Sequence, residues 1–368
     1  MQATIALLPG DGIGPEVTGA AERVLRAVAD RFGHTFTLTS HLIGGAALHA
    51  GQPPLPDDTR EACQAADAVL LGAVGDPAFD TGTSERRPET ALLELRQVLG
   101  VFANLRPARV WPGLEDGGAF KSEFVTGADM LIVRELTGGI YYGEPRGVAA
   151  DRQSAFNTMR YSRPEIERIA EVAFRSARER RGFVTSVDKA NVLETSRLWR
   201  EVVSEVSARY PDVKLEHQYV DSCALLLATN PKHFDVVLSG NLFGDILSDE
   251  ASVLAGSMGM LPSASLAGVP AAEGRKRARG LYEPIHGSAP DIAGQGKANP
   301  IATILSVALM LRYSLGLPKE GEAVERAVEQ VLGAGYRTPD LACPGEPTVD
   351  TTMMGQAVAD AVRDGAGV

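Results

Sequence analysis

Short apolar runs alternate along the chain with longer segments of helical period, and this alternation limits the possible folds more than any other feature. Strands are predicted at 4–9, 67–74, 101–110, 129–135, 183–188, 214–220, 234–240 and 281–285. Helices are predicted at 15–30, 88–99, 164–180, 190–209, 244–255, 299–315, 321–332 and 351–363. This order is typical of an α/β protein with a largely parallel sheet. The 368 residues suffice for about two domains.

Two segments depart from this order. Residues 139–161, GIYYGEPRGVAADRQSAFNTMRY, carry aromatic and turn residues without helical period, which predicts a β-hairpin or a protruding arm. Residues 263–280 read as a loop with four basic side chains: Arg275, Lys276, Arg277 and Arg279. A targeting or nucleic-acid patch and a solvated surface loop both remain open there, and the acidic chain as a whole favours the solvated loop.

Composition excludes several classes of protein. A net charge of −11 argues against a general nucleic-acid binder, which must neutralise phosphates, and no apolar tract is long enough to span a membrane. The three cysteines, Cys63, Cys223 and Cys343, are far apart and form no CxxC pair. We therefore expect buried thiols in a reducing compartment, and an N-terminus without a basic leader also favours a cytoplasmic protein.

The glycine-rich stretch LPGDGIGPEV, residues 8–17, raises the question of a dinucleotide site. Its spacing is GxGxG, whereas the usual fingerprint is GxGxxG with an acidic residue at the end of the next strand. The next strand-like run, TFTLTSHLIGG, ends without an acid. A tight turn with Pro15 at the first helical position is therefore favoured over a Rossmann site. Any nucleotide site is expected elsewhere.

The predicted helix 88–99 has two different faces. Ala91, Leu95, Val98 and Leu99 form a core stripe, whereas Glu89, Leu92, Leu93 and Arg96 share the other face. That second face is either a solvent-exposed surface or a pocket wall that accepts an alkyl group and an anion. Two further arginines, Arg106 and Arg134, lie on predicted strands. Three guanidinium groups would suit a dicarboxylate.

Carboxylates follow two other predicted strands. Asp245 and Asp249 are four residues apart after FDVVLSG, so they share a helix face and repel each other unless a cation lies between them. No histidine lies beside them, which favours Mg²⁺ or Mn²⁺ over zinc, although a solvated acidic helix remains an alternative. Asp221 closes the strand VKLEHQYV, and Lys189 ends FVTSVD as either a proton acceptor or an ion-pair lysine.

Eight ordered segments resemble the isocitrate/isopropylmalate dehydrogenase family of decarboxylating dehydrogenases, which includes homoisocitrate and tartrate enzymes. The segments are LLPGDGIGPEV, RRPETALLELR, NLRPARV, LIVRELTGGIYYGEPRG, SVDKANVLETSRLWR, YVDSCAL, NLFGDILSDEAS and EPIHGSAPDIAGQGKANP. The likeness runs from residue 4 to about residue 363, although the loop at 263–280 is longer than this family usually has.

The resemblance implies a two-domain isopropylmalate dehydrogenase-like fold with a mixed, largely parallel central sheet, which is not a Rossmann fold. Residues 1–101 plus 256–368 would form a cofactor-binding domain. Residues 102–255 would form a domain for substrate, metal and dimerisation, with the arm at about 139–161. A homodimer is implied, in which Lys189 and Asp221 enter the active site from the partner.

The resemblance also implies a role for individual residues. The cofactor NAD would lie on 286–299 with a contact from Glu89, and its other contacts would be His286, Gly287, Ser288, Ala289, Pro290, Asp291, Ile292 and Asn299. Asp291 would bind the ribose hydroxyls and repel the 2′-phosphate of NADP, although Lys297 slightly weakens that repulsion. Arg96, Arg106 and Arg134 would hold the malate carboxylates. Asp221, Asp245 and Asp249 would bind the metal, and Tyr141 and Lys189 would transfer protons.

The implied reaction is NAD-dependent oxidative decarboxylation of 3-isopropylmalate to 4-methyl-2-oxopentanoate and CO₂ in leucine biosynthesis. Leu92 and Leu93 favour an isopropyl group over a third carboxylate, which leaves homoisocitrate, isocitrate and tartrate as alternative substrates. Two further hypotheses differ in class. A metal-dependent phosphotransferase lacks support because GxxxxGK[ST] is absent, and a catalytically silent binding protein is disfavoured by the intact acid, base and aspartates.

Overall fold

The computed structural model describes residues 1–79, 87–115, 120–269 and 278–365. Ten strands form one mixed sheet in the order β2-β1-β3-β12-β11-β4-β5-β10-β8-β9. Their bounds are β1 Gln2–Gly10, β2 Thr35–Ser40, β3 Ala68–Ala73, β4 Ala103–Arg109, β5 Asp129–Glu135, β8 Phe183–Asp188, β9 Lys214–Tyr219, β10 Val236–Ser239, β11 Pro262–Leu266 and β12 Gly280–Pro284. The predicted α/β fold with a mixed, largely parallel sheet is confirmed.

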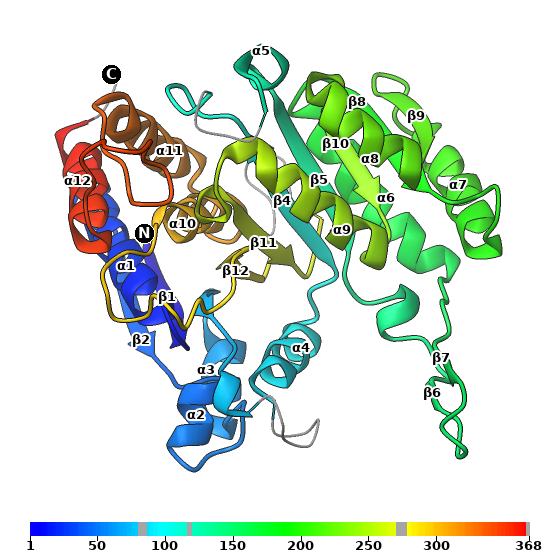
Figure 1. Ribbon diagram of the computed structural model, residues 1–368, viewed down its shortest axis with the longest axis horizontal. Coiled ribbons are helices and arrows are strands. Elements are labelled where there is room, and N and C mark those ends of the chain that lie inside the picture. The colour runs from blue at the N-terminus through cyan, green and yellow to red at the C-terminus, as the bar shows by residue number, and fades with distance from the viewer. Residues whose placement is uncertain (80–86, 116–119, 270–277, 366–368) are drawn as a thin grey trace.

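Helices cover both faces of this sheet (Figure 1). Their bounds are α1 Gly14–Phe32, α2 Gly45–His49, α3 Asp57–Ala65, α4 Pro88–Leu99, α5 Ser122–Val125, α6 Arg163–Arg178, α7 Glu194–Ser207, α8 Val220–Thr229, α9 Asn241–Ser252, α10 Ile301–Tyr313, α11 Pro318–Gly333 and α12 Thr351–Asp364. Helix α1 packs on α12, α6 on α7, and α8 on α9. Every residue of α10 from Ile301 to Leu311 is buried, because this helix is apolar on all sides.

The strand direction changes in the middle of the sheet. Strand β11 runs antiparallel to both β12 and β4, and β4 runs antiparallel to β5. The pairs on either side, such as β1 with β3 and β10 with β5, are parallel. One half of the sheet comes from a single continuous segment, because β4, β5, β10, β8 and β9 all lie within residues 103–239. The other half, β2, β1, β3, β12 and β11, combines strands from before and after that segment.

The predicted strands and helices all have counterparts in the structure, with shifts of a few residues at their ends. The loop predicted at 263–280 is wrong in its first part, because Ser263–Leu266 belong to β11 and are buried on both sides by β12 and β4. Three of its four basic residues, Arg275, Lys276 and Arg277, lie outside the described residues. Helices α2, α3, α5 and α8 are additional elements that the periodicity did not reveal.

The arm predicted at 139–161 is confirmed as a hairpin. Its two short strands, β6 (Gly147–Val148) and β7 (Ala155–Phe156), pair antiparallel and lie apart from the main sheet (Figure 1). Val148 and Phe156 are exposed there, with 63% and 50% of their surface accessible. An arm with exposed apolar side chains has no core of its own to cover them.

The cysteines only partly match the expectation of buried thiols. All three are free, and Cys63 and Cys223 are buried, but Cys343 is exposed. Burial raises the pKa of both buried thiols to about 12, so these two groups stay protonated. Across the described residues, no helix combines the length and apolar character needed to cross a membrane.

The N-terminal glycine loop packs directly against residues 286–299. The backbone N–H of Ile13 donates to the carbonyl oxygen of Ser288 at 2.8 Å, and a Cβ atom at Gly12 would lie 1.9 Å from that oxygen. The Glu16 carboxylate accepts hydrogen bonds from the backbone N–H groups of Gly294 and Gly296. The loop that resembles a dinucleotide fingerprint therefore supports the later loop.

We expect Gly12→Ala to destabilise the protein more than Gly33→Ala. Both glycines have a positive φ, +55° and +69°, so each alanine incurs similar backbone strain of about 1 kcal/mol. Only Gly12 also faces another backbone at close range, which adds about 1–3 kcal/mol of overpacking, whereas nothing lies within 4 Å of the Cβ position at Gly33. Urea unfolding of both variants measures the difference, and equal losses would contradict the close approach.

Candidate active site

Neighbouring strands bring Arg134 and the aspartates of α9 to one edge of the sheet. Arg134 pairs with Ser239 in the parallel register of β5 and β10, and α9 begins two residues after Ser239. The carboxyl end of β5 therefore lies beside the start of α9, which carries Asp245 in its second turn. Parallel α/β sheets place ligand sites at this carboxyl edge.

Arg134 forms the centre of this cluster. Its guanidinium pairs with the Asp245 carboxylate, and its Nη2 and Nε donate to the side-chain and backbone oxygens of Asn241 at 2.8 and 3.0 Å. Arg134 is only 4% exposed, and burial lowers the pKa of its guanidinium to about 10. Asn241, which holds this arginine in place, was not predicted from the sequence.

Arg106 approaches the same aspartates from β4. Its Nε donates to Asn104 Oδ1 at 2.8 Å, and its Nη1 donates to Ser248 Oγ at 2.6 Å. The same Nη1 lies 3.7 Å from Asp245 Oδ1 and 3.5 Å from Asp249 Oδ1. Burial lowers the pKa of Arg106, and the negative charge of Asp245 acts in the opposite direction. Arg106 and Arg134 thus share the charge of one carboxylate.

The aspartate pair lies on one face of α9, as the spacing predicts. The sequence favours a cation beside these carboxylates, with a solvated acidic helix as the alternative, and the structure places two arginines next to them. Burial raises the pKa of Asp249, whereas Arg106 lowers it. The Asp249 side chain is 61% exposed, so its carboxylate keeps access to a further ligand.

Tyr141 reaches the cluster from the start of the arm. Its hydroxyl donates to Asp245 Oδ2 at 2.9 Å, and the residue is 39% exposed. Burial raises the pKa of the phenol, and the hydrogen bond to Asp245 raises it further. The phenol therefore stays protonated at neutral pH and is able to donate a proton.

Lys189 and Asp221 form a separate pair in this chain. The Lys189 ammonium donates to the Asp221 carboxylate, and this hydrogen bond lowers the pKa of Asp221. Asp221 was predicted to close a strand, but β9 ends at Tyr219 and Asp221 lies in the first turn of α8. Within the described part of a single chain, no three His, Cys, Asp or Glu side chains form a metal-binding group. One chain therefore does not bring Asp221 together with Asp245 and Asp249.

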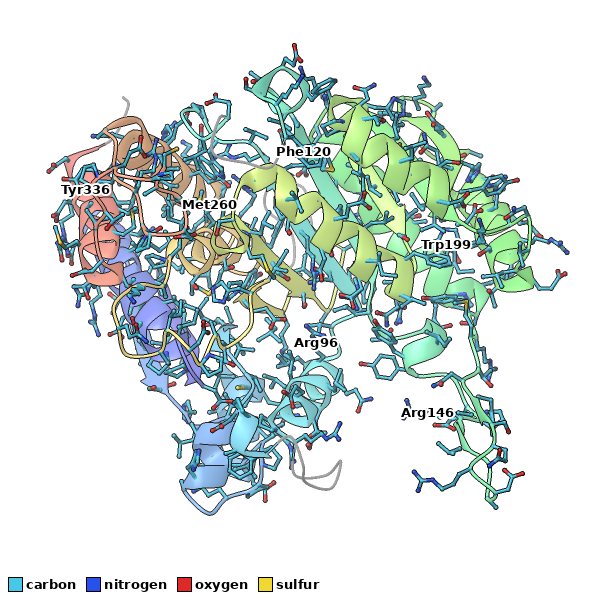
Figure 2. The ribbon with its side chains drawn as sticks, in the orientation of Figure 1. Arg96, Phe120, Arg146, Trp199, Met260 and Tyr336 are labelled. Carbon is cyan, nitrogen blue, oxygen red and sulfur yellow. The ribbon has the colours of Figure 1, made fainter. Side chains whose placement is uncertain are left out.

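The two faces predicted for helix 88–99 match the burial of the side chains on α4. Ala91, Leu95 and Leu99 are buried and Val98 is partly buried, whereas Leu92 is half-buried and Leu93 is 45% exposed. Arg96 lies between α4 and the sheet (Figure 2), where its Nη2 donates to Glu283 Oε1 of β12 at 2.8 Å. Glu283, which holds this arginine, was not found from the sequence.

The predicted cofactor segment forms an irregular loop between β12 and α10. A Cβ atom at Gly75 would lie 3.2 Å from Ser288 Oγ and 3.4 Å from Glu89 Oε1, so the loop, α4 and the end of β3 converge there. The Asp291 carboxylate is exposed, and Ile292 packs against the small cluster of Ile13, Val17 and Ala298.

Two residues of this segment have contrasting hydrogen bonds. His286 Nδ1 lies 2.9 Å from the carbonyl oxygen of Gly287, which can only accept, so Nδ1 carries the proton. Burial lowers the pKa of His286, and its buried Nε2 has no hydrogen-bond partner among the described residues. Asn299 instead bonds within the protein, to Asp340 at 3.1 Å and to the backbone of Ile301 at 3.0 Å.

Comparisons with known proteins identify the family to which this chain belongs. The family model described as isocitrate/isopropylmalate dehydrogenase matches residues 4–358. The chain belongs to the isocitrate/isopropylmalate dehydrogenase family. A 3-isopropylmalate dehydrogenase from Nitratidesulfovibrio vulgaris is 55% identical over 366 residues, covering 98% of this chain and 100% of that protein. A relative of the same name from Halalkalibacterium halodurans is 54% identical over 365 residues, covering 99% of this chain and 98% of that protein.

Solved structures of this family share the fold. The crystal structure of isocitrate dehydrogenase from Methylococcus capsulatus has a TM-score of 0.85 and 36% identity, covering 98% of this chain and 99% of that one. A β-decarboxylating dehydrogenase from Thermococcus kodakarensis has a TM-score of 0.79 and 36% identity, covering 98% and 96%. The family fold therefore extends over nearly the whole chain.

We expect Glu283→Gln to destabilise the protein by about 2–3 kcal/mol, because it leaves the Arg96 charge unpaired in a largely buried position. The matched control is Glu94→Gln on α4, the helix of Arg96, which leaves Arg60 paired with Asp57 and removes the Arg60–Glu94 ion pair. That pair is 33% and 47% exposed, against 13% and 10% for Arg96 and Glu283, so its loss costs at most about 1 kcal/mol. Chemical unfolding at neutral pH compares the two, and equal effects would contradict a special role for burial.

Proposed function

We propose that this chain catalyses the oxidative decarboxylation of 3-isopropylmalate to 4-methyl-2-oxopentanoate and CO₂, with NAD as hydride acceptor, in leucine biosynthesis. The match to proteins named 3-isopropylmalate dehydrogenase, at 54–55% identity over nearly the full length of both chains, carries this proposal. The cluster of Arg106, Arg134, Tyr141 and Asp245 supports it, because it offers two anion-binding groups beside a proton donor.

A nucleotide fits residues 286–299. The buried His286 Nε2 lacks a hydrogen-bond partner among the described residues, and a buried ring nitrogen normally has one. An adenine amino group or a ribose hydroxyl would donate to it. The exposed Asp291 carboxylate suits the ribose hydroxyls of NAD and opposes the 2′-phosphate of NADP. Ser288 and Glu89 face the same point beside Gly75.

A divalent metal fits the aspartates of α9. Asp245 and Asp249 supply only oxygen atoms, which Mg²⁺ and Mn²⁺ prefer. Two carboxylates are few for such an ion, and we propose that Asp221 of the partner subunit adds a third. The Asp221 side chain is 62% exposed in a single chain, so it is accessible to a second copy.

Exposed apolar side chains support a homodimer. Helices α8 and α9 pack together, yet Leu225 and Ile246 on them are 67% and 56% exposed. The arm adds exposed Val148 and Phe156. Exposed apolar groups on adjacent elements mark surfaces that a partner covers. Asp221 and Asp245 belong to the same two helices, so a twofold contact there would bring one copy's Lys189 and Asp221 towards the other's Asp245.

The chain's own residues supply binding and proton transfer. Arg96, Arg106 and Arg134 would hold the two substrate carboxylates through paired N–H donors. Lys189 of the partner subunit would accept the proton of the substrate hydroxyl, and Tyr141 would donate a proton to the carbon that loses CO₂. When bound, NAD would accept the hydride, and the metal would polarise the substrate oxygens and stabilise developing negative charge.

The exposed face of α4 would decide the substrate. Leu92 and Leu93 offer hydrocarbon, so an isopropyl group would gain roughly 1–3 kcal/mol of binding free energy there. A third carboxylate at that place would lose water without gaining a partner, at a cost of several kcal/mol. Isocitrate and homoisocitrate, which carry that carboxylate, are therefore poorer substrates, and tartrate lacks the alkyl group.

The order of strands supports the two-domain division. Strands β2, β1, β3, β12 and β11 come from residues 1–101 and 256–368, which we propose as the cofactor domain. The other five strands come from residues 102–255, proposed for substrate, metal and dimerisation. Three free cysteines fit a reducing compartment, so we also propose a cytoplasmic location.

A substrate panel tests the proposed reaction. Initial rates with 3-isopropylmalate, isocitrate, homoisocitrate and tartrate are measured with NAD and NADP, with Mg²⁺ and after chelation. We expect kcat/KM for 3-isopropylmalate to exceed the others by about a hundredfold or more, since a misplaced carboxylate costs several kcal/mol. NAD should outperform NADP, and chelation should abolish turnover. A better rate with isocitrate would overturn the substrate, and metal-independent turnover would overturn the metal.

Mixed dimers test the shared active site. Lys189→Ala and Asp245→Asn should each lower kcat by about a hundredfold or more, because each removes one essential group. If Lys189 acts in the partner's site, each mixed dimer has one intact site, so a statistical mixture regains about a quarter of wild-type activity. The matched control mixes Lys189→Ala with Asp221→Asn. Both residues would enter the partner's site, so each site of a mixed dimer keeps one defect and no activity returns. No recovery in the first mixture would show that Lys189 acts within its own chain.

A further inference from the structure

A cavity of about 350 Å³ lies on the opposite face of the sheet from the candidate active site. Side chains alternate between the two faces along a strand. On β4, Asn104 and Arg106 belong to the active-site cluster, whereas Pro107 and Arg109 line the cavity. On β5, Arg134 belongs to the cluster and Leu131 lines the cavity. The two strands thus separate the active-site cluster from the cavity.

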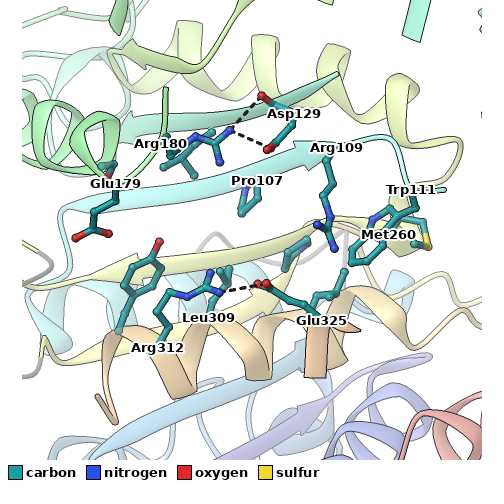
Figure 3. A pocket seen from close by; sticks show the side chains of 15 residues that line it. Pro107, Arg109, Trp111, Asp129, Glu179, Arg180, Met260, Leu309, Arg312 and Glu325 are labelled. Carbon is teal, nitrogen blue, oxygen red and sulfur yellow. Dashed lines mark hydrogen bonds and ion pairs between the residues drawn. The ribbon is translucent and has the colours of Figure 1, made fainter. Parts of the chain in front are cut away.

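The walls of the cavity come from both proposed domains. Strands β4 and β5 and the end of α6 form one side, and helices α10 and α11 form the other (Figure 3). Leu131 on the first side and Leu305 and Leu309 on the second make its middle apolar. A volume of this size is at the lower end of the usual range for small-ligand sites, about 300–1,000 Å³.

Most charges in the cavity are already paired. Arg180 pairs with Asp129 at 2.9 Å on one side, and Arg312 pairs with Glu325 at 3.1 Å on the other. Arg109 differs, because among the described residues its guanidinium forms neither an ion pair nor a hydrogen bond. Its Cζ lies 3.4 Å from the centroid of the buried Trp111 ring, and Figure 3 shows it pointing from β4 towards α10.

The remaining charged group is Glu179, which lies away from Arg109 in Figure 3. Among the described residues its carboxyl group has no ion-pair partner, and burial raises its pKa. Arg312 lowers that pKa from across the cavity. Burial likewise lowers the pKa of Arg109, whereas Glu325 and Asp129 raise it. Arg109 is therefore the half-buried cation of this cavity that has no fixed counter-ion among the described residues.

We propose that this cavity is a second ligand site, for a small organic carboxylate with an apolar body. The planar donor fork of Arg109 matches a carboxylate, and Trp111 holds the guanidinium in one orientation. The apolar body would lie against Leu305 and Leu309. Because the walls come from both proposed domains, a bound ligand would also fix the distance between them.

The test uses 3-phenylpropionate as the probe and 3-phenylpropanamide as its uncharged match. The chain has only two tryptophans, so a Trp199→Phe background leaves Trp111 as the single reporter in the cavity wall. Titration should change Trp111 fluorescence saturably with the acid. The amide should bind about tenfold or more weakly, because it lacks the charge that Arg109 recognises. Calorimetry on the unaltered wild-type chain repeats the comparison.

Arg109→Gln should weaken binding of the acid by about tenfold or more, since one charge-assisted pair is lost. The matched control is Arg178→Gln, an exposed arginine at the end of α6 that pairs with Asp212 outside the cavity, and it should leave binding unchanged. Equal binding of acid and amide, no saturable binding by the wild type, or an equal loss in Arg178→Gln would each overturn the proposal. The acid and amide comparison decides even if Arg109→Gln fails to fold.

Discussion

Antiparallel pairing of β4 with β5 is the constraint on which the candidate active site depends. The register places Asn104 opposite Arg134, and residues directly opposite each other project from the same face of a sheet. Arg106, two residues after Asn104, shares that face and is a diagonal neighbour of Arg134. One backbone register therefore brings two guanidinium groups close together, and β10 beside β5 then directs α9 and Asp245 towards them.

Two buried arginines this close need negative charge, and Asp245 and Asp249 provide it. The four side chains together carry no net charge when all are ionised. A dicarboxylate bound with a divalent cation also adds no net charge, so substrate and metal together would preserve the balance of the site. Either ligand alone would disturb it, because a lone dianion meets the aspartates and a lone cation meets the arginines. Ordered or mutually dependent binding of the proposed substrate and metal would follow from this arrangement.

Local periodicity predicted the elements whose burial is visible in their own residues, such as α4 with its stripe of Ala91, Leu95 and Leu99. It failed for β11, whose residues PSASL have no strand pattern and are buried only because β12 and β4 pair with them. The candidate arginines and aspartates were found by residue type and position. Their partners were not, because Glu283 lies 187 residues from Arg96 and Asn241 lies 107 from Arg134.

The same alternation that assembles the active site also fixes what lies behind it. Arg106 and Arg109 are three residues apart on one strand, so they face opposite sides of the sheet, one among carboxylates and the other without a counter-ion. The active-site cluster and the cavity both lie against β4, and the cavity walls come from both proposed domains. A ligand that holds those walls at a fixed distance would therefore act on the strand that also carries Arg106.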